Sequence, residues 1–585
     1  MMRYSILSIV LLFCVNSIAQ ISPPKVYEQN KTLSYSELIS EYKKIADASP
    51  KAQLFEYGKT DIGKPLHLFV ISDYREFDPK VLRKDNMRIV LINNGIHPGE
   101  PAGMEASLQL AAQLLSKDNE IGKILKNTVV CIIPAYNIGG MLNRSAFNRA
   151  NQNGPEECGF RGNARNRDLN RDYMICETEN AQTFTEIFHK WKPDVFLETH
   201  TTDGSDHQYT ISLITTAHQD LPPSMSAYLD KEMRPALFKK MEEKSSFKMV
   251  PYVHVWRTPP DDGFQQTFEP PMMSTGYTSL FNVFSFMTEN HIFKPFEDRV
   301  NSCIDFMHCL LEYTHDNADK IKEIREAATN ELKEQNDFVL KWKIDSSKYE
   351  MINFQGYEAT YPPSKLTGEP LLYYDRNKLF TKDVKYFNHF NSTLTKKAPE
   401  YFIIPQAWKE VISRLKRNDV KMDKLKEDIS LEVDMYYIDN YKTFETPYNG
   451  HYRHYDISTS TKTMKVNFYK GDYVVPVKGK EKYYIMYALE PEADESFFAW
   501  NLFDEILQSR EYFSPFVFEE KAVAMLDTIP GLKDKLMEAI AKDASMAKSA
   551  YKQMLFIYQN SPYFEVTFKR YPVGRIYNKM ELPID

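Results

Sequence analysis

The first half of the chain alternates short apolar runs with amphipathic stretches. Residues 87–95, 127–137 and 193–200, together with the run that ends at Thr288, are apolar on both faces. Strands of this kind lie in a mostly parallel sheet that is covered on both sides. Three stretches between or after them have helical periodicity: residues 101–115, 179–191 and 296–313. The pattern predicts an α/β fold, in which a mixed, mostly parallel sheet is sandwiched by helices.

The pattern changes after about residue 332, where the chain becomes polar and charged. Tyrosine-rich, strand-like segments follow, such as YYDRNKLF and TMKVNFYKGDYVVPV, and helical patterns return between residues 522 and 558. We therefore predict a first domain at residues 20–335 and an α+β, Tyr-rich C-terminal region at residues 336–585, of one or two subdomains.

The N-terminus has the pattern of a secretory signal peptide. Arg3 precedes the apolar run SILSIVLLF, and the small residues Ser17 and Ala19 follow it. The alternative is a transmembrane anchor, but the run is shorter than the roughly 20 residues that a membrane span needs. We expect cleavage after residue 19 and a secreted or periplasmic protein without a transmembrane anchor.

Composition narrows the classes of function. The 585 residues are 43% hydrophobic and 26% charged, which is typical of a globular protein. A net charge of −7 and the lack of a basic tail give no reason to expect a nucleic-acid partner. Five of the six cysteines follow the predicted leader, and their spacing matches neither a disulfide framework nor a zinc finger. A single bond between Cys158 and Cys176 is the one pairing we considered.

Polar side chains follow the predicted strands where each one ends. His97 and Glu100 come directly after one strand, and His200 ends another. The carboxyl ends of such strands meet at one edge of an open α/β sheet, which is where ligands bind. Two histidines and one carboxylate form a three-ligand set that leaves the fourth position of a catalytic zinc ion open. His207 is the alternative third ligand, but it lies beyond the turn at Gly204, so we prefer His200.

A further carboxylate lies at a third strand end. Glu289 is the first acidic residue after a long apolar run, where low dielectric would raise its pKa toward a value useful for a general base. Glu198 is the rival base. It lies two residues before His200 on the same face of its strand, a position more typical of a residue that supports the site.

The loop between these strands is rich in arginine. The segment GFRGNARNRDLNRDYM, residues 159–174, contains four arginines and three asparagines. Guanidinium groups bind carboxylates through two parallel hydrogen bonds and keep their charge. The alternative is a solvated basic loop, but the stretch DLNRDY, flanked by a strand and a helix, is more specific than that.

Together these motifs resemble the zinc carboxypeptidases of the funnelin type, over roughly residues 30–325. The resemblance rests on HPGE, DLNRD, a strand that ends in TH and a strand that ends in Glu, in that order. It implies one Zn²⁺ per chain, bound by His97, Glu100 and His200. It also implies Glu289 as the general base.

The resemblance assigns further roles to residues that contact substrate. Asn170 and Arg171 would hold its terminal carboxylate, and Arg144 or Arg149 would stabilise the oxyanion. Of these two arginines we choose Arg149, which is nearer the DLNRD motif. Tyr277 is the candidate for the family's mobile tyrosine, although it lies closer to the glutamate than that residue usually does.

The sequence therefore predicts a secreted zinc metallopeptidase that removes C-terminal residues from peptides or from peptidoglycan peptides. The alternatives are a cell-wall peptide amidase or an N-acyl amino-acid deacylase on the same site, or a non-catalytic peptide-binding relative. The deacylases are shorter, and no ligand or base required for catalysis is missing here.

Overall fold

The structure is a computed structural model that describes residues 22–116, 120–255 and 258–585. The predicted signal peptide lies outside these residues. Within the described ranges, no helix has both the length and the apolar composition that a bilayer span requires. The chain divides into two compact units. The first comprises the chain up to Leu332 together with Lys343–Asn391, and the second comprises Lys333–Trp342 and Ser392–Asp585.

The first unit is built on an eight-stranded sheet with the order β1-β2-β4-β3-β5-β9-β6-β7. Its four central strands are parallel and are the four apolar runs predicted from the sequence. β2 and β6 pair antiparallel with the central strands, β1 pairs antiparallel with β2, and β7 is parallel to β6. The bounds are β1 Ala52–Tyr57, β2 Leu66–Ile71, β3 Arg88–Asn93, β4 Thr128–Ile133, β5 Val195–Thr202, β6 Ile211–Thr215, β7 Met249–Pro251 and β9 Phe284–His291. The predicted mixed α/β fold is confirmed.

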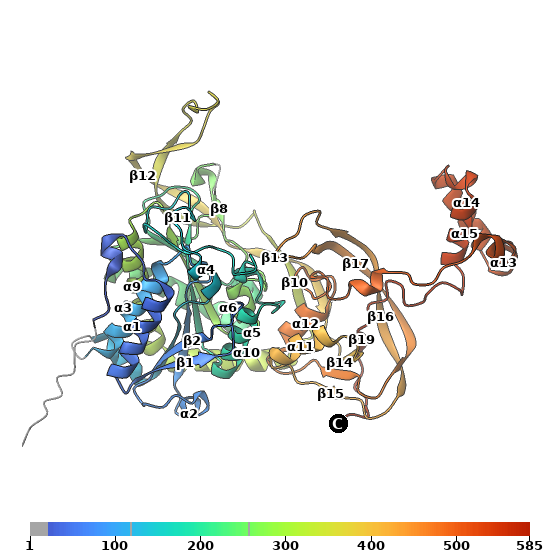
Figure 1. The fold of residues 1–585 in the computed structure, drawn as a ribbon, viewed down its shortest axis with the longest axis horizontal. Coiled ribbons are helices and arrows are strands. Elements are labelled where there is room, and N and C mark those ends of the chain that lie inside the picture. Colours follow the sequence, from blue (N-terminus) through green and yellow to red (C-terminus); the bar gives the residue numbers. More distant parts are fainter. Residues whose placement is uncertain (1–21, 117–119, 256–257) are drawn as a thin grey trace, which may run out of the picture. The chain divides into compact units, whose positions relative to one another are not determined.

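Helices cover this sheet and bury its apolar residues. Helix α3 (Ala102–Leu115) packs against α9 (Phe296–Asp316), and α1 (Tyr35–Ala48) packs against α3 (Figure 1). Val195 and Leu197 of β5 belong to the core that these helices share with the sheet. Phe196 contacts Phe184 of helix α5 (Glu179–Trp191) instead. Because successive side chains of a strand point to opposite faces, Glu198 and His200 lie on the Phe196 face.

The first unit also contains a three-stranded sheet. The long hairpin of β11 (Glu350–Thr360) and β12 (Tyr373–Phe387) joins it to β8 (Phe264–Gln265), which pairs parallel with β12. Phe354 and Val384 of the hairpin pack on Tyr209 and Phe264. The division of the chain into two units therefore differs from the predicted boundary at residue 335. Residues 343–391 follow that boundary in the sequence but pack with the first unit.

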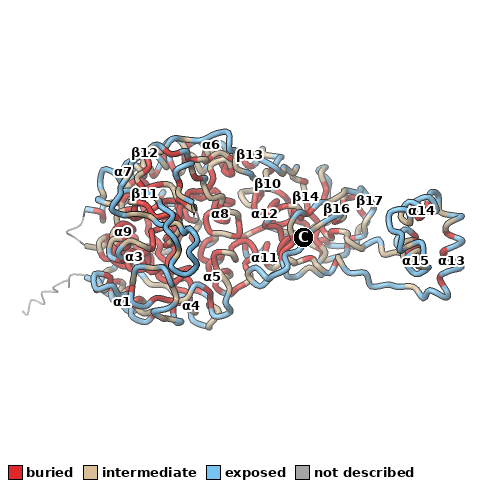
Figure 2. Tube along the Cα trace, turned by 90° about the horizontal axis from the view of Figure 1, so that it is seen from above, coloured by how far each residue is buried: buried red, intermediate tan, exposed pale blue. Residues whose placement is uncertain are grey.

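The second unit is an α+β structure around a six-stranded sheet with the order β15-β18-β14-β19-β16-β17. Its four shorter strands are β14 Tyr401–Ile404, β15 Asp423–Lys424, β18 Tyr473–Pro476 and β19 Gly574–Ile576. Its longest pair is the hairpin of β16 (Ile429–Thr443) and β17 (His454–Phe468). Helices α13 (Pro515–Thr528), α14 (Leu532–Lys542) and α15 (Ala550–Gln559) pack on one another around a small core of their own. Most of the surface of these three helices is exposed (Figure 2).

Candidate metal centre

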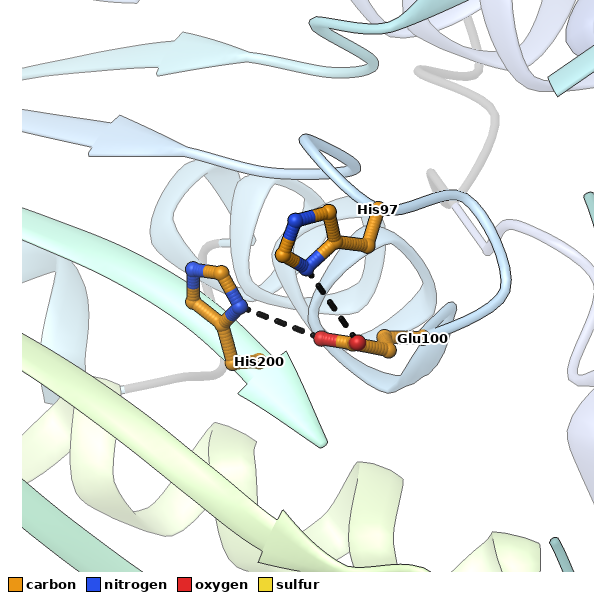
Figure 3. Close-up of side chains that lie close together, drawn as sticks. All are labelled: His97, Glu100 and His200. Atoms are coloured by element: carbon orange, nitrogen blue, oxygen red, sulfur yellow. Dashed lines mark hydrogen bonds and ion pairs between the residues drawn. The ribbon is translucent and has the colours of Figure 1, made fainter. Parts of the chain in front are cut away.

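Three candidate ligands meet at the carboxyl ends of β3 and β5. His97, Glu100 and His200 are buried, and one ligand atom of each lies within 4.8 Å of the others. The two histidines approach the same carboxylate (Figure 3): His97 Nδ1 lies 3.2 Å from Glu100 Oε1, and His200 Nδ1 lies 3.1 Å from Oε2. Of the histidines predicted as the third ligand, the structure brings His200 to this cluster, and His207 is absent from it.

The local chain explains how His97 and Glu100 reach the same point. β3 ends at Asn93, and a turn follows in which the Glu100 N–H donates to the His97 carbonyl at 2.8 Å. Helix α3 begins two residues later, at Ala102. Gly99 leaves room for Arg149, because a Cβ at this position would lie 2.6 Å from Arg149 Nε.

The outer nitrogen of each histidine ring is held by a carboxylate. His97 Nε2 lies 3.0 Å from Asp168 Oδ1, and His200 Nε2 lies 2.9 Å from Glu198 Oε2. A carboxylate on the outer nitrogen fixes the ring and its tautomer, so that the inner nitrogen can bind a metal. Asp168 and Glu198 therefore orient the two rings toward the same point.

Glu198 is the centre of a buried hydrogen-bond network. Besides His200, it accepts bonds from Asn93 Nδ2 at 2.9 Å, the Tyr173 hydroxyl at 2.7 Å and the Ser274 hydroxyl at 2.5 Å. Burial raises the pKa of Glu198, but the bonds from His200 and Ser274 outweigh it and lower the pKa. A carboxylate with this many donors supports its neighbours and is a poor proton acceptor.

Glu289 lies beside His200 because of the strand register. β5 and β9 are parallel neighbours, and His200 is paired with Glu289. The Glu289 side chain is part-buried, and its Oε2 has no hydrogen-bond partner among the described residues. Burial raises the pKa of Glu289 to about 8, against the opposing charge of His200. These are the surroundings expected of a general base, in contrast to those of Glu198.

Arginines surround the Glu100 carboxylate. Arg149 Nη2 donates to Glu100 Oε1 at 2.6 Å, whereas Arg144 donates to the backbone carbonyls of Thr32, Leu33 and Glu157. Arg161, which the sequence argument did not single out, makes two hydrogen bonds to Asp168 Oδ2 and lies 3.6 Å from Glu100. Of the two arginines predicted for the oxyanion, Arg149 is thus the one that contacts the site.

The DLNRD segment is tied to the metal cluster through Asp168. Asp168 Oδ1 also accepts from the Asn170 N–H at 2.9 Å, which turns the chain into the short helix η3, Leu169–Arg171. Asn170 Oδ1 accepts from the Ser274 N–H at 3.1 Å, and Arg171 Nη1 donates to the Asn170 carbonyl at 2.6 Å. The segment is held on both sides, so Asn170 and Arg171 have a set place near the cluster.

Tyr277 occupies a different environment from the one predicted. It is fully buried in helix α8 (Ser274–Ser279), its hydroxyl lies 3.2 Å from His189 Nε2, and its ring packs on Tyr173, Phe188 and Phe281. The structure therefore places the Tyr277 side chain in an aromatic core and not at the metal cluster. The charges of Glu289 and Glu269 act on another tyrosine, Tyr252, and add to the rise in its pKa that burial causes.

The cluster has the chemistry that zinc requires. Zinc is bound by imidazole nitrogen and carboxylate oxygen at about 2.1 Å, so neighbouring ligand atoms lie roughly 3–3.5 Å apart. The two histidine–glutamate distances fall in this range. His97 Nδ1 is buried and has no hydrogen-bond partner among the described residues, as expected of a nitrogen that binds a metal. Burial raises the pKa of Glu100, but the charges of His97 and Arg149 outweigh it and keep the carboxylate ionised.

Comparison with known proteins agrees with this centre. Residues 38–265 match the zinc carboxypeptidase family, Peptidase_M14. This range contains the three clustered ligands and the DLNRD segment. Residues 38–265 therefore belong to a zinc carboxypeptidase domain. The chain is a metallocarboxypeptidase, and the metal of the matched family is Zn²⁺. Glu289 lies beyond the matched range, and the pairing of β5 with β9 brings it to the carboxypeptidase centre.

Individual relatives are distant. Carboxypeptidase 2 of Trichophyton tonsurans is 22% identical over 422 residues, which cover 70% of this chain and 72% of that protein. Carboxypeptidase 2 of Trichophyton rubrum is 21% identical over 427 residues, or 71% and 73% of the two chains. Among solved structures, a metallo-carboxypeptidase from Burkholderia cenocepacia has a TM-score of 0.36 at 15% identity and covers 49% of this chain and 69% of its own. Carboxypeptidase A from Helicoverpa armigera has a TM-score of 0.35 at 15% identity, with 52% and 75% covered.

Proposed function

We propose that this metallocarboxypeptidase holds one zinc ion with His97, Glu100 and His200 and uses Glu289 as its general base. One observation carries the proposal: a part-buried carboxylate with a raised pKa lies in register with His200, the third residue of the cluster. When bound, zinc supplies Lewis-acid chemistry that polarises a peptide carbonyl and makes a water molecule easier to deprotonate.

The proposed reaction is hydrolysis of the last peptide bond. Glu289 accepts a proton from the attacking water and later delivers it to the leaving amine, so that proton uptake and release balance. Arg149 stabilises the negative charge that develops on the carbonyl oxygen. This assignment is supported by its place at Glu100, where its guanidinium carries a full positive charge next to the cluster.

The DLNRD segment selects the end of the substrate. Arg171, with Asn170 beside it, binds the terminal carboxylate and so places only the last peptide bond at the zinc cluster. The hydrogen bonds of Asp168 to His97 and of Asn170 to Ser274 support a set distance between anchor and cluster. The signal-peptide pattern at residues 1–19 supports the further proposal that the enzyme is secreted.

The proposal is tested with pairs of peptides that differ only in a free or an amidated C-terminus. The purified protein should release the terminal residue of the free acid, and chelation of the metal should abolish the reaction. Added Zn²⁺ should restore it. If the amidated peptide were cleaved equally well, the proposed carboxylate anchor would be wrong. An endo-acting enzyme or a cell-wall amidase would then be favoured.

A further inference from the structure

Glu269 is a buried carboxylate that the proposed mechanism does not use. It lies in the extended segment between β8 and α8, and only 7% of its surface is exposed. Its Oε2 is sealed from solvent and has no hydrogen-bond partner among residues 22–116, 120–255 and 258–585. A buried carboxylate without a partner is costly, so a residue of this kind suggests a ligand group that completes it.

The position of Glu269 is set by close backbone packing. A Cβ on Gly276, in the first turn of α8, would lie 2.2 Å from the Glu269 carbonyl oxygen. The absence of a side chain on Gly276 therefore lets the Glu269 backbone lie directly on the helix. Ser274, which starts this helix, donates its N–H to Asn170 and its hydroxyl to Glu198. The same short helix thus packs against the backbone of Glu269 and holds Asn170 beside the proposed anchor Arg171.

The charges of both the anchor and the metal cluster act on Glu269. Burial raises its pKa to about 7, the charges of Arg171 and His200 oppose the rise, and the charge of Glu198 adds to it. Glu269 in turn raises the pKa of Glu289. Glu198 already accepts four hydrogen bonds, so of these two acids Glu269 is the one with acceptor capacity left.

We propose that Glu269 binds the positively charged side chain of the substrate's C-terminal residue, so that the enzyme prefers peptides that end in lysine or arginine. The proposal rests on the proposed function, because it assumes that the terminal carboxylate is held at Arg171. With that carboxylate in place, the group that reaches a carboxylate beside the anchor is the side chain of the same residue.

Other terminal side chains fit this environment less well. An apolar side chain beside Glu269 would leave its carboxylate desolvated without a partner, and an acidic one would add repulsion to Glu198, Glu269 and Glu289. A lysine or arginine side chain brings donors and a positive charge, which restores the ionised carboxylate. The order expected is therefore basic, then apolar, then acidic.

The test compares N-blocked peptides that are identical except for the last residue: lysine, norleucine, arginine or glutamate. Norleucine has the chain of lysine without its ammonium group. The wild type should show kcat/KM at least tenfold higher for lysine than for norleucine, and lowest for glutamate. In Glu269→Gln this ratio should fall close to one, mainly through KM for the lysine peptide, while zinc content stays unchanged. Glu186→Gln, an exposed position on α5, is the matched control and should keep the ratio.

A second measurement needs no variant. Free L-lysine should inhibit the wild type at concentrations at least tenfold lower than L-norleucine does. Equal use of the lysine and norleucine peptides, with no change in Glu269→Gln, would overturn the subsite and leave the carboxypeptidase activity standing. If none of the free-acid peptides were cleaved, the proposed function itself would fail.

Discussion

Buried carboxylates occur in both units of the chain, and two acids near the metal cluster of the first unit differ from the paired ones of the second. In the second unit Glu495 accepts from Arg453 at 2.9 Å and from the indole of Trp500 at 2.8 Å, and Glu490 pairs with Arg575 at 3.2 Å. In the first unit Oε2 of Glu269 and Oε2 of Glu289 have no hydrogen-bond partner in the part of the chain that the structure describes.

Paired and unpaired buried carboxylates have different roles in the molecule. A paired buried carboxylate is satisfied by the fold and has nothing to offer a ligand. An unpaired one costs stability, which the rest of the unit must offset, and keeps its acceptor capacity for substrate or for a proton. Burial by itself therefore does not mark the functional acids of this protein, and neither does one unpartnered oxygen, since Oε2 of Glu105 and Oε2 of Glu490 also lack a hydrogen-bond partner among the described residues. Glu269 and Glu289 differ from these because the charge of His200 acts on both.

Loss of the metal should have the largest effect on the first unit. His200→Ala leaves two of the three ligands, so zinc content should fall well below one per chain and peptide hydrolysis should drop to background. Elemental analysis and turnover on a free-acid peptide measure both. His207→Asn is the matched control, since His207 is also buried but lies outside the cluster, and it should retain zinc.

Breaking a pair in the second unit should act on stability and not on zinc binding. Glu495→Ala leaves Arg453 buried without its carboxylate, which should lower the free energy of unfolding by about 3–5 kcal/mol. Denaturant unfolding measures this, and the zinc content should remain that of the wild type. Glu519→Ala, exposed on α13, should change stability by less than about 0.5 kcal/mol. If Glu495→Ala left the free energy of unfolding unchanged, the contrast between the two units would be wrong.

Substitution of Glu289, the proposed general base, should lower turnover without lowering stability. Glu289→Gln keeps the shape of the side chain but cannot accept the proton, so kcat should fall at least about 100-fold with zinc content and stability maintained. Steady-state kinetics and elemental analysis are the measurements. Near-normal turnover of Glu289→Gln would indicate that Glu198 is the general base instead.

The anchor should have a smaller and more selective effect. Arg171→Ala should lower kcat/KM for a free-acid peptide by at least about tenfold, because a shielded arginine–carboxylate contact is lost. The amidated peptide offers no carboxylate, so its slow hydrolysis should change little. An equal loss on both peptides would indicate a general distortion of the site.

The smallest expected effect is a pH dependence of stability. The pKa of Glu269 is raised from 4.5 to about 7 by burial, so its protonated form stabilises the fold below pH 4.5, and this contribution is lost as the pH rises through 7. In chelator-treated protein, the wild type should lose on the order of 1 kcal/mol relative to Glu269→Gln between pH 4.5 and pH 7. Denaturant unfolding at the two pH values checks this. If the free energy of unfolding of the wild type and of Glu269→Gln changed equally between the two pH values, the buried charge of Glu269 would already be balanced by its surroundings.

The sequence alone was enough for features that depend on neighbours along the chain. Apolar runs predicted β3, β4, β5 and β9, because strands buried on both faces require continuous hydrophobic residues. The ends of β3 and β5 then identified His97, Glu100 and His200, since the carboxyl ends of parallel strands share one edge of the sheet. Arg149 could be preferred over Arg144 only by its nearness to the DLNRD motif, and its contact with Glu100 agrees with that choice.

Only the tertiary structure could decide features that depend on register and on long-range packing. The pairing of β5 with β9 sets Glu289 beside His200, although 89 residues separate them in the chain. Tyr277 packs against Tyr173 and Phe188, which its sequence position did not indicate, and a hairpin distant in sequence joins the first unit through β8. Glu269 carries no local signal at all. Whether a buried carboxylate finds a partner depends on side chains that folding brings to it, and no pattern along the chain records that.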